Sequence, residues 1–202
     1  ETQRKFCNTL MNTYSFLAMY ANIDGFNANT SHIPVPDRPE IDRWIISRLN
    51  TTIKQVEEYF DAYEPTRAAR QMETFVEELS NWYVRRNRRR FWKSGTTLDK
   101  TAAYQTLHEC LLSMSQLMSP IAPFISEWLY QRLINAMSAY EESVHLSFFP
   151  TVEETAILPA LEHKMERARL ISAIVLRIRN QIDLIVRQPL ARIILPIKDE
   201  VE

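Results

Sequence analysis

Apolar side chains recur every three or four residues along most of the chain, which places them on one face of a helix. In one stretch, for example, Met72, Phe75, Leu79 and Tyr83 share such a face. The pattern predicts six helices. They run over residues 4–21, 40–62, 65–93, 99–119, 123–136 and 159–187.

Proline, glycine and a few polar residues mark the ends of these helices. We expect Pro65 to begin the third helix, because proline suits the first helical position, and Gly95 to end it. Asp99 is the expected N-cap of the fourth helix, and Pro189 is expected to stop the sixth. After that proline, residues 193–195 are β-branched or apolar and predict a short strand.

Glycine is scarce, with 2 among 202 residues. A phosphate-cradling glycine loop needs more glycines than this, and so does a β-barrel with many tight turns. The sequence therefore predicts an all-α protein. Five helices are expected to pack as a bundle over residues 1–155. Residues 156–202 are expected to hold the sixth helix and the start of a C-terminal module, and both ends of the chain look cut from a longer protein.

Several functional classes find no support in the sequence. Cys7 and Cys110 lie far apart, with no metal-ligand spacing around them, so we expect neither a zinc site nor a disulfide framework. Adjacent glutamates point apart on a helix, and none of the four histidines has a metal-ligand partner at helical spacing. No apolar run reaches 18 residues, and no membrane span is expected. We expect a monomer in the cytoplasm, without a cofactor or catalytic residue of its own.

A cluster of positive charge ends the third helix and is called the basic segment, residues 85–93. It contains six cations and no acid, although the whole chain has a net charge of -1. Extending the helical phase from Tyr83 places Arg86 and Arg90 on the core face, with Arg85 and Arg88 further round. The inner face of the helix is thus expected to become cationic beyond the end of the bundle.

Arginine pairs phosphate oxygens through two hydrogen bonds, and aromatic rings stack on unpaired bases. The basic segment and its aromatic neighbours therefore predict an RNA-binding site, although a solvated helix end remains an alternative. Trp82 is either a core residue or a stacking platform, and residues 163–192, with a net charge of +5, are either a second basic surface or a solvated helix face. The candidate residues are Asn81, Trp82, Arg85, Arg86, Arg88, Arg89, Arg90, Trp92 and Lys93.

Residues 79–92 resemble the signature of the anticodon-binding domain of isoleucyl-tRNA synthetases. Residues 42–50, Asp-Arg-Trp-Ile-Ile-Ser-Arg-Leu-Asn, are similar to a block of the class I synthetases for aliphatic amino acids. Residues 118–124 with 143–146, and residues 186–190, resemble further passages of that family. The Asn-Trp-Tyr-Val-Arg-Arg motif with its arginine run indicates isoleucine, because the Asp-Arg-Trp and Ala-Pro-Phe blocks also occur in the valyl and leucyl enzymes.

The resemblance implies a helical bundle that grips the anticodon stem-loop of an isoleucine-accepting tRNA. The parent activity it implies is the ATP-dependent joining of isoleucine to tRNA, with ATP and magnesium held in a catalytic domain. The two ATP-binding signatures, the editing domain and the zinc module of the family are missing from these residues. Two alternatives stay open: the same module of a valyl or leucyl enzyme, and an all-α protein-interaction module that binds an acidic partner.

Overall fold

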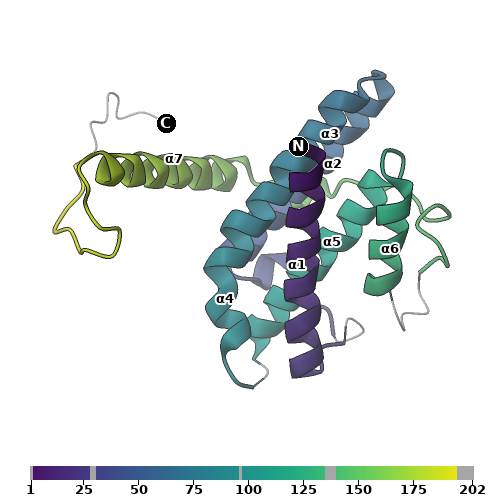
Figure 1. The fold of residues 1–202 in the computed structure, drawn as a ribbon. Coiled ribbons are helices and arrows are strands. Elements are labelled where there is room, and N and C mark those ends of the chain that lie inside the picture. The colour runs from purple at the N-terminus through teal and green to yellow at the C-terminus, as the bar shows by residue number, and fades with distance from the viewer. Residues whose placement is uncertain (1, 28–30, 96, 135–139, 195–202) are drawn as a thin grey trace. The chain divides into compact units, whose positions relative to one another are not determined.

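The computed structural model describes residues 2–27, 31–95, 97–134 and 140–194. Within them the chain is all-α, without a strand (Figure 1). The helices are α1 (Thr2–Asp24), α2 (Glu40–Asp61), α3 (Pro65–Glu78), α4 (Arg85–Trp92), α5 (Leu98–Met118), α6 (Pro123–Leu133) and α7 (Pro159–Gln181). A π-helical turn, η2 (Leu79–Val84), joins α3 to α4, and short 3₁₀ turns lie at η1 (Val35–Asp37) and η3 (Glu154–Ala156). The six predicted helical regions are confirmed, the third as α3, η2 and α4 in sequence.

Some of the predicted helix ends were wrong. The N-cap of α5 is Thr97, whose hydroxyl accepts a hydrogen bond from the Lys100 amide, and Asp99 lies inside the helix. Helix α7 ends at Gln181, ahead of Pro189. Asp183 adopts a left-handed conformation with a φ of 51°, and a Schellman-type bond from the Leu184 amide to the Arg179 carbonyl closes that end.

The predicted strand over residues 193–195 is only partly within the described residues. Ile193 and Ile194 are not in a strand, and Leu195 lies outside the described residues. None of the described helices is long and apolar enough to cross a bilayer.

The chain forms two compact units, residues 1–162 and 163–202. The first contains α1 to α6 and the first turn of α7. The second contains the rest of α7, none of whose residues is buried. Leu170, for example, is 60% exposed.

Helix α5 lies at the centre of the first unit and packs against α1, α2, α4 and α6. Its buried side chains come from all round the helix, as expected for a helix with neighbours on several sides. The largest fully buried side chains of the unit include Trp44, Phe75, Tyr83 and Phe91. Close packing of such large side chains leaves little freedom in how α2, α3 and α4 lie against one another.

The first turn of α7 is fixed to α2 within the first unit. One oxygen of Glu162 accepts hydrogen bonds from Ser47, at 2.5 Å, and from Thr51, at 2.8 Å. Its other oxygen accepts from Nη1 of Arg48, at 2.9 Å. The Leu158 amide also donates to the Ser47 hydroxyl. Polar side chains of α2 therefore determine where α7 begins.

Candidate functional site

The basic segment follows directly on the π-helical turn η2. In this turn the Arg85 amide donates to the Ser80 carbonyl, five residues back, instead of the four of an α-helix. The extra residue delays the helical phase by about 100°. Side chains after η2 therefore face directions other than those expected from an uninterrupted α-helix.

This change of phase corrects the predicted inner face. The residues that continue the buried stripe beyond Tyr83 are Val84, Asn87 and Phe91, and Arg86 is exposed. The prediction that Arg86 lies on the core face was wrong, because the period of 3.6 was carried across a turn that does not follow it. Arg90 does point toward the bundle, with a side chain that is 13% exposed.

The guanidinium of Arg90 is bound to a carboxylate of the core. Asp42 of α2 is fully buried and accepts from Nη1 of Arg90 at 2.7 Å and from Nη2 at 2.8 Å. The Tyr83 hydroxyl donates to the same carboxylate at 2.8 Å. Arg90 also donates from Nε to Asp99 of α5, at 3.1 Å, and from Nη1 to the Asn87 side chain, at 3.0 Å. These partners occupy Arg90 within the protein.

The pKa values of this network reflect its burial and pairing. Burial by itself lowers the pKa of Arg90, but the hydrogen bonds and charge of Asp42 outweigh it and raise that pKa above its ordinary value. Burial and the nearby Asp42 charge raise the pKa of the Tyr83 hydroxyl well above its ordinary value. Arg90 is therefore charged and Tyr83 is a neutral donor across the physiological range.

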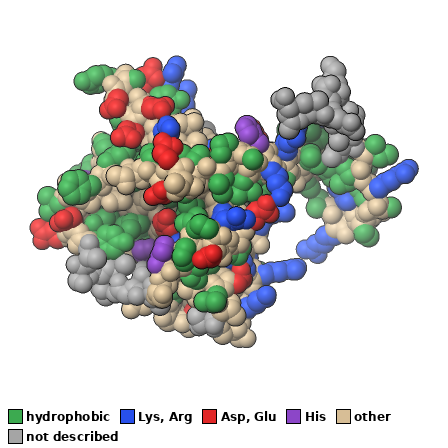
Figure 2. All heavy atoms as spheres, turned by 180° about the vertical axis from the view of Figure 1, so that it is seen from behind, with side chains coloured by type: hydrophobic (Ala, Val, Ile, Leu, Met, Phe, Trp, Pro, Cys, Tyr) green, Lys and Arg blue, Asp and Glu red, His purple; other side chains and the backbone are tan. Residues whose placement is uncertain are grey.

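The remaining cations of the basic segment are exposed and have no acidic partner within the part of the chain that the structure describes. No carboxylate of the described residues forms an ion pair with Arg85, Arg86, Arg88, Arg89 or Lys93. Figure 2 shows Lys and Arg side chains projecting from the lower part of the bundle, where α4 ends. Their charges thus add to a local positive potential that can attract a polyanion.

Aromatic and polar side chains lie beside these cations. Trp92 is 58% exposed, and Asn81 is exposed on η2. Trp82 is half-buried, with the Arg86 guanidinium 4.9 Å from its ring centroid. Phe91, by contrast, is buried in edge-to-face contacts within the core. Trp92 is therefore an exposed ring next to Lys93, and Trp82 is a partly exposed ring next to Arg86; aromatic rings of this kind can stack on bases.

A buried lysine fixes the far end of α4. Nζ of Lys100 donates to the Lys93 carbonyl at 2.8 Å and forms an ion pair with Asp24 of α1. Tyr104 also donates to Asp24. Lys100 is 2% exposed, so its charge is held inside the protein. Together with Asp42 and Asn87 it supports the basic segment, and sequence reasoning missed the supporting role of all three.

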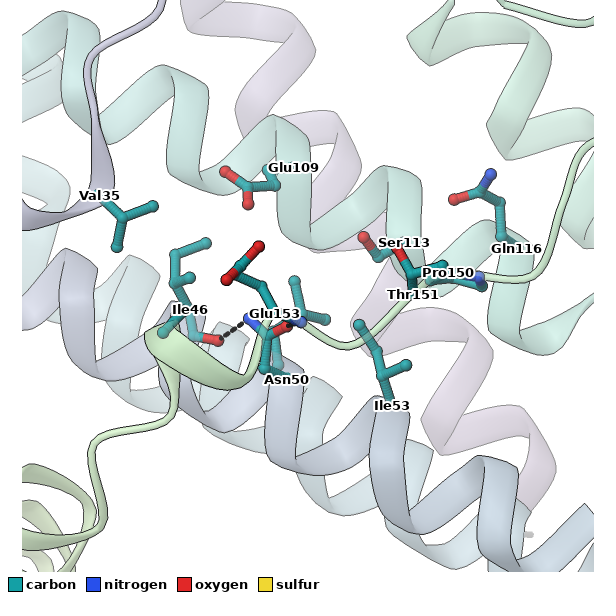
Figure 3. Close-up of a pocket in the computed structure, with 12 residues that line it drawn as sticks. Val35, Ile46, Asn50, Ile53, Glu109, Ser113, Gln116, Pro150, Thr151 and Glu153 are labelled. Atoms are coloured by element: carbon teal, nitrogen blue, oxygen red, sulfur yellow. Dashed lines mark hydrogen bonds between the residues drawn. The ribbon is translucent and has the colours of Figure 1, made fainter.

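A separate cavity of about 260 Å³ lies between α2, α5 and residues 150–156 (Figure 3). The Glu109 and Glu153 carboxylates line it, and the Glu153 amide donates to the Asn50 side chain at 2.7 Å. No group of three or more possible metal ligands occurs among the described residues. None of the candidate RNA-binding residues lines this cavity.

Comparison with known proteins shows which family the sequence resembles. Residues 42–195 match the family model described as "Anticodon-binding domain of tRNA ligase". The isoleucine–tRNA ligase of Porphyromonas gingivalis is 50% identical over 201 residues, which are 99% of this chain and 17% of that relative. The isoleucine–tRNA ligase of Cytophaga hutchinsonii is 49% identical over 98% of this chain and 18% of its own length. The isoleucine–tRNA ligase of Dehalococcoides mccartyi is 44% identical over 96% of this chain and 19% of its own length. The chain therefore spans less than a fifth of these relatives.

Proposed function

Since the chain belongs to the family of anticodon-binding domains of tRNA ligases, we propose that it binds the anticodon stem-loop of an isoleucine-accepting tRNA. The observation that carries the proposal is the exposed cationic surface of the basic segment, which lacks acidic partners among the described residues. Phosphates provide the missing negative charge. The similarity to isoleucine–tRNA ligases supports the choice of tRNA.

Each exposed side chain has a proposed role in this complex. Arg85, Arg88, Arg89 and Lys93 neutralise backbone phosphates and release counterions from the RNA. Trp92 and the Trp82–Arg86 pair offer flat surfaces to unstacked bases, and Asn81 offers an amide for hydrogen bonds to a base edge or the backbone. The phosphate contacts supply most of the affinity, and the rings and amide supply contacts to the bases.

We propose further that the chain acts as part of an isoleucine–tRNA ligase. In that protein the remaining sequence supplies the ATP- and magnesium-dependent chemistry, and this chain holds the far end of the tRNA. Its place of action is then the cytoplasm, and one copy of the chain suffices for one anticodon. The chain by itself should show no isoleucine-dependent pyrophosphate exchange.

Two other functions are possible outcomes of the experiment described below. A valyl or leucyl enzyme uses a similar bundle, and a protein-interaction module uses the arginines to bind acidic side chains. The identities of 44–50% to isoleucine–tRNA ligases favour the first proposal.

The experiment titrates the protein into fluorescently labelled stem-loops with isoleucine, valine and leucine anticodons, beside an acidic peptide. We expect the isoleucine stem-loop to bind tightest and the peptide to bind weakly. If the acidic peptide binds as tightly as the stem-loops or more tightly, RNA is rejected as the preferred ligand. Tighter binding of the valine or leucine stem-loop would reject the choice of isoleucine.

A further inference from the structure

We propose that Asp42 and Arg90 position the basic segment for RNA, and that Arg90 does so from inside the protein without binding a phosphate. The inference rests on the proposed function and assigns a role to two residues outside the contact surface. The arginines of the basic segment then have two different roles, because Arg90 positions α4 and the exposed arginines bind the RNA.

The geometry of Arg90 is that of a brace between three helices. Its two terminal nitrogens both bind the fully buried Asp42 of α2, and its Nε binds Asp99 of α5. Nη2 also donates to the Asp99 carbonyl, at 2.6 Å. A planar guanidinium held by four such hydrogen bonds, two to Asp42 and two to Asp99, is fixed in its orientation. Because Arg90 belongs to α4, that orientation fixes the rotation of α4 about its own axis.

The rotation matters because of the π-helical turn before α4. A shift of one residue in this turn would rotate α4 by about 100° and exchange buried for exposed positions. Asn87 acts against such a shift, since its Nδ2 donates to the Tyr83 carbonyl at 2.9 Å and its Oδ1 accepts from Arg90. In the observed rotation Arg85, Arg88 and Arg89 face solvent. The pair of Asp42 and Arg90 thus decides which arginines meet the RNA.

The charge of Asp42 makes it possible to distinguish a positioning role of Asp42 and Arg90 from a purely electrostatic effect on RNA binding. Asp42 carries a negative charge close to the cationic surface, so electrostatics alone predicts that removing it strengthens RNA binding. Loss of Asp42 would also leave Arg90 with Asp99 and Asn87 alone, and a less firmly held arginine adds to phosphate binding. Positioning predicts the opposite sign, because α4 loses its fixed rotation.

The test compares D42N and R90K with two controls on the same helical regions, D61N at the exposed end of α2 and R70K on α3. R90K keeps the charge but cannot form the bidentate pair with Asp42 together with the bonds to Asp99 and Asn87. We expect both D42N and R90K to weaken binding of the isoleucine stem-loop roughly tenfold, and both controls to bind as the wild type does. Circular dichroism confirms the helical content of each variant.

A second measurement needs no RNA. Hydrogen exchange of the backbone amides of residues 85–92 should accelerate in D42N and R90K, while α2 and α3 keep their protection. Unchanged exchange in residues 85–92, or tighter RNA binding by D42N together with unaltered binding by R90K, would overturn the inference. Failure of the wild type to bind any stem-loop would instead reject the proposed function, and the exchange data would still decide whether the pair fixes α4.

Discussion

The guanidinium carbon of Arg86 lies 4.9 Å from the centroid of the Trp82 ring, four residues earlier in the chain. This distance is typical of a cation–π pair. The pair joins the π-helical turn to the start of α4 and presents one aromatic and one planar cationic group side by side. Arg132 and Trp128 form the same kind of pair on α6, at 4.2 Å, away from the basic segment.

Replacement of Trp82 by alanine should lower RNA affinity about tenfold, because stacking on an aromatic ring contributes about 1–3 kcal/mol per base. Its cost in stability should stay below that of Phe91→Ala, about 3–5 kcal/mol, since Trp82 is half-buried and Phe91 is 1% exposed. Stem-loop titration and urea denaturation measure the two effects.

Trp128→Ala is the matched control for this prediction, because it removes the same kind of cation–π pair from α6. It should leave RNA affinity unchanged. A Trp82→Ala variant that binds RNA like the wild type while losing as much stability as Phe91→Ala would show that Trp82 is a core residue only.

The ion pair of Arg48 and Glu162 predicts a stability difference between two glutamates. Glu162→Ala removes three hydrogen bonds and leaves Arg48 with Glu78 alone, so we expect a loss of about 2–3 kcal/mol. Glu154→Ala removes the exposed pair with Lys54, which solvent screens, and should cost much less stability than Glu162→Ala. Urea denaturation of both variants tests the difference, and equal costs would contradict it.

His108 predicts a dependence of stability on pH. Burial lowers its pKa from the ordinary 6.5, and the carbonyl of Leu133, 3.0 Å away, accepts from Nε2–H of the neutral ring. The unfolded chain therefore binds a proton more readily than the folded one, and the contribution of His108 to stability falls as the pH drops through 6.5. His108→Gln should flatten the pH profile of the urea midpoint between about pH 5 and 7. A variant with the wild-type profile would exclude His108 as the cause.

The sequence predicts the six helical regions because their apolar stripes and end signals are local. Pro65 begins α3, and Gly95, with a φ of 83°, follows the end of α4 as expected. The end of α7 was missed because Asp183 takes the left-handed position that glycine usually takes, so no glycine marks the end. Local rules thus find a helix more reliably than the residue at which it ends.

The candidate site shows a second limit. The cations and aromatic residues of residues 81–93 are recognisable in the sequence. Which of them are exposed, however, depends on the π-helical turn, and no residue type in the sequence predicts that turn. The partner of Arg90 is also remote, since Asp42 lies 48 positions away. Only packing brings the two together, and only the packed structure separates the arginine bound to Asp42 from the exposed ones.

The most direct test of the account is the salt dependence of isoleucine stem-loop binding for R85A, R88A and R89A, with R70A on α3 as the control. Each phosphate neutralised contributes about 0.7–0.9 to the slope of log affinity against log salt. We predict that each of the three variants binds more weakly and that its slope is smaller by roughly the contribution of one phosphate. R70A should match the wild type in affinity and slope. Wild-type affinity and slope in all three variants would contradict the assignment of the basic segment as the RNA-binding surface.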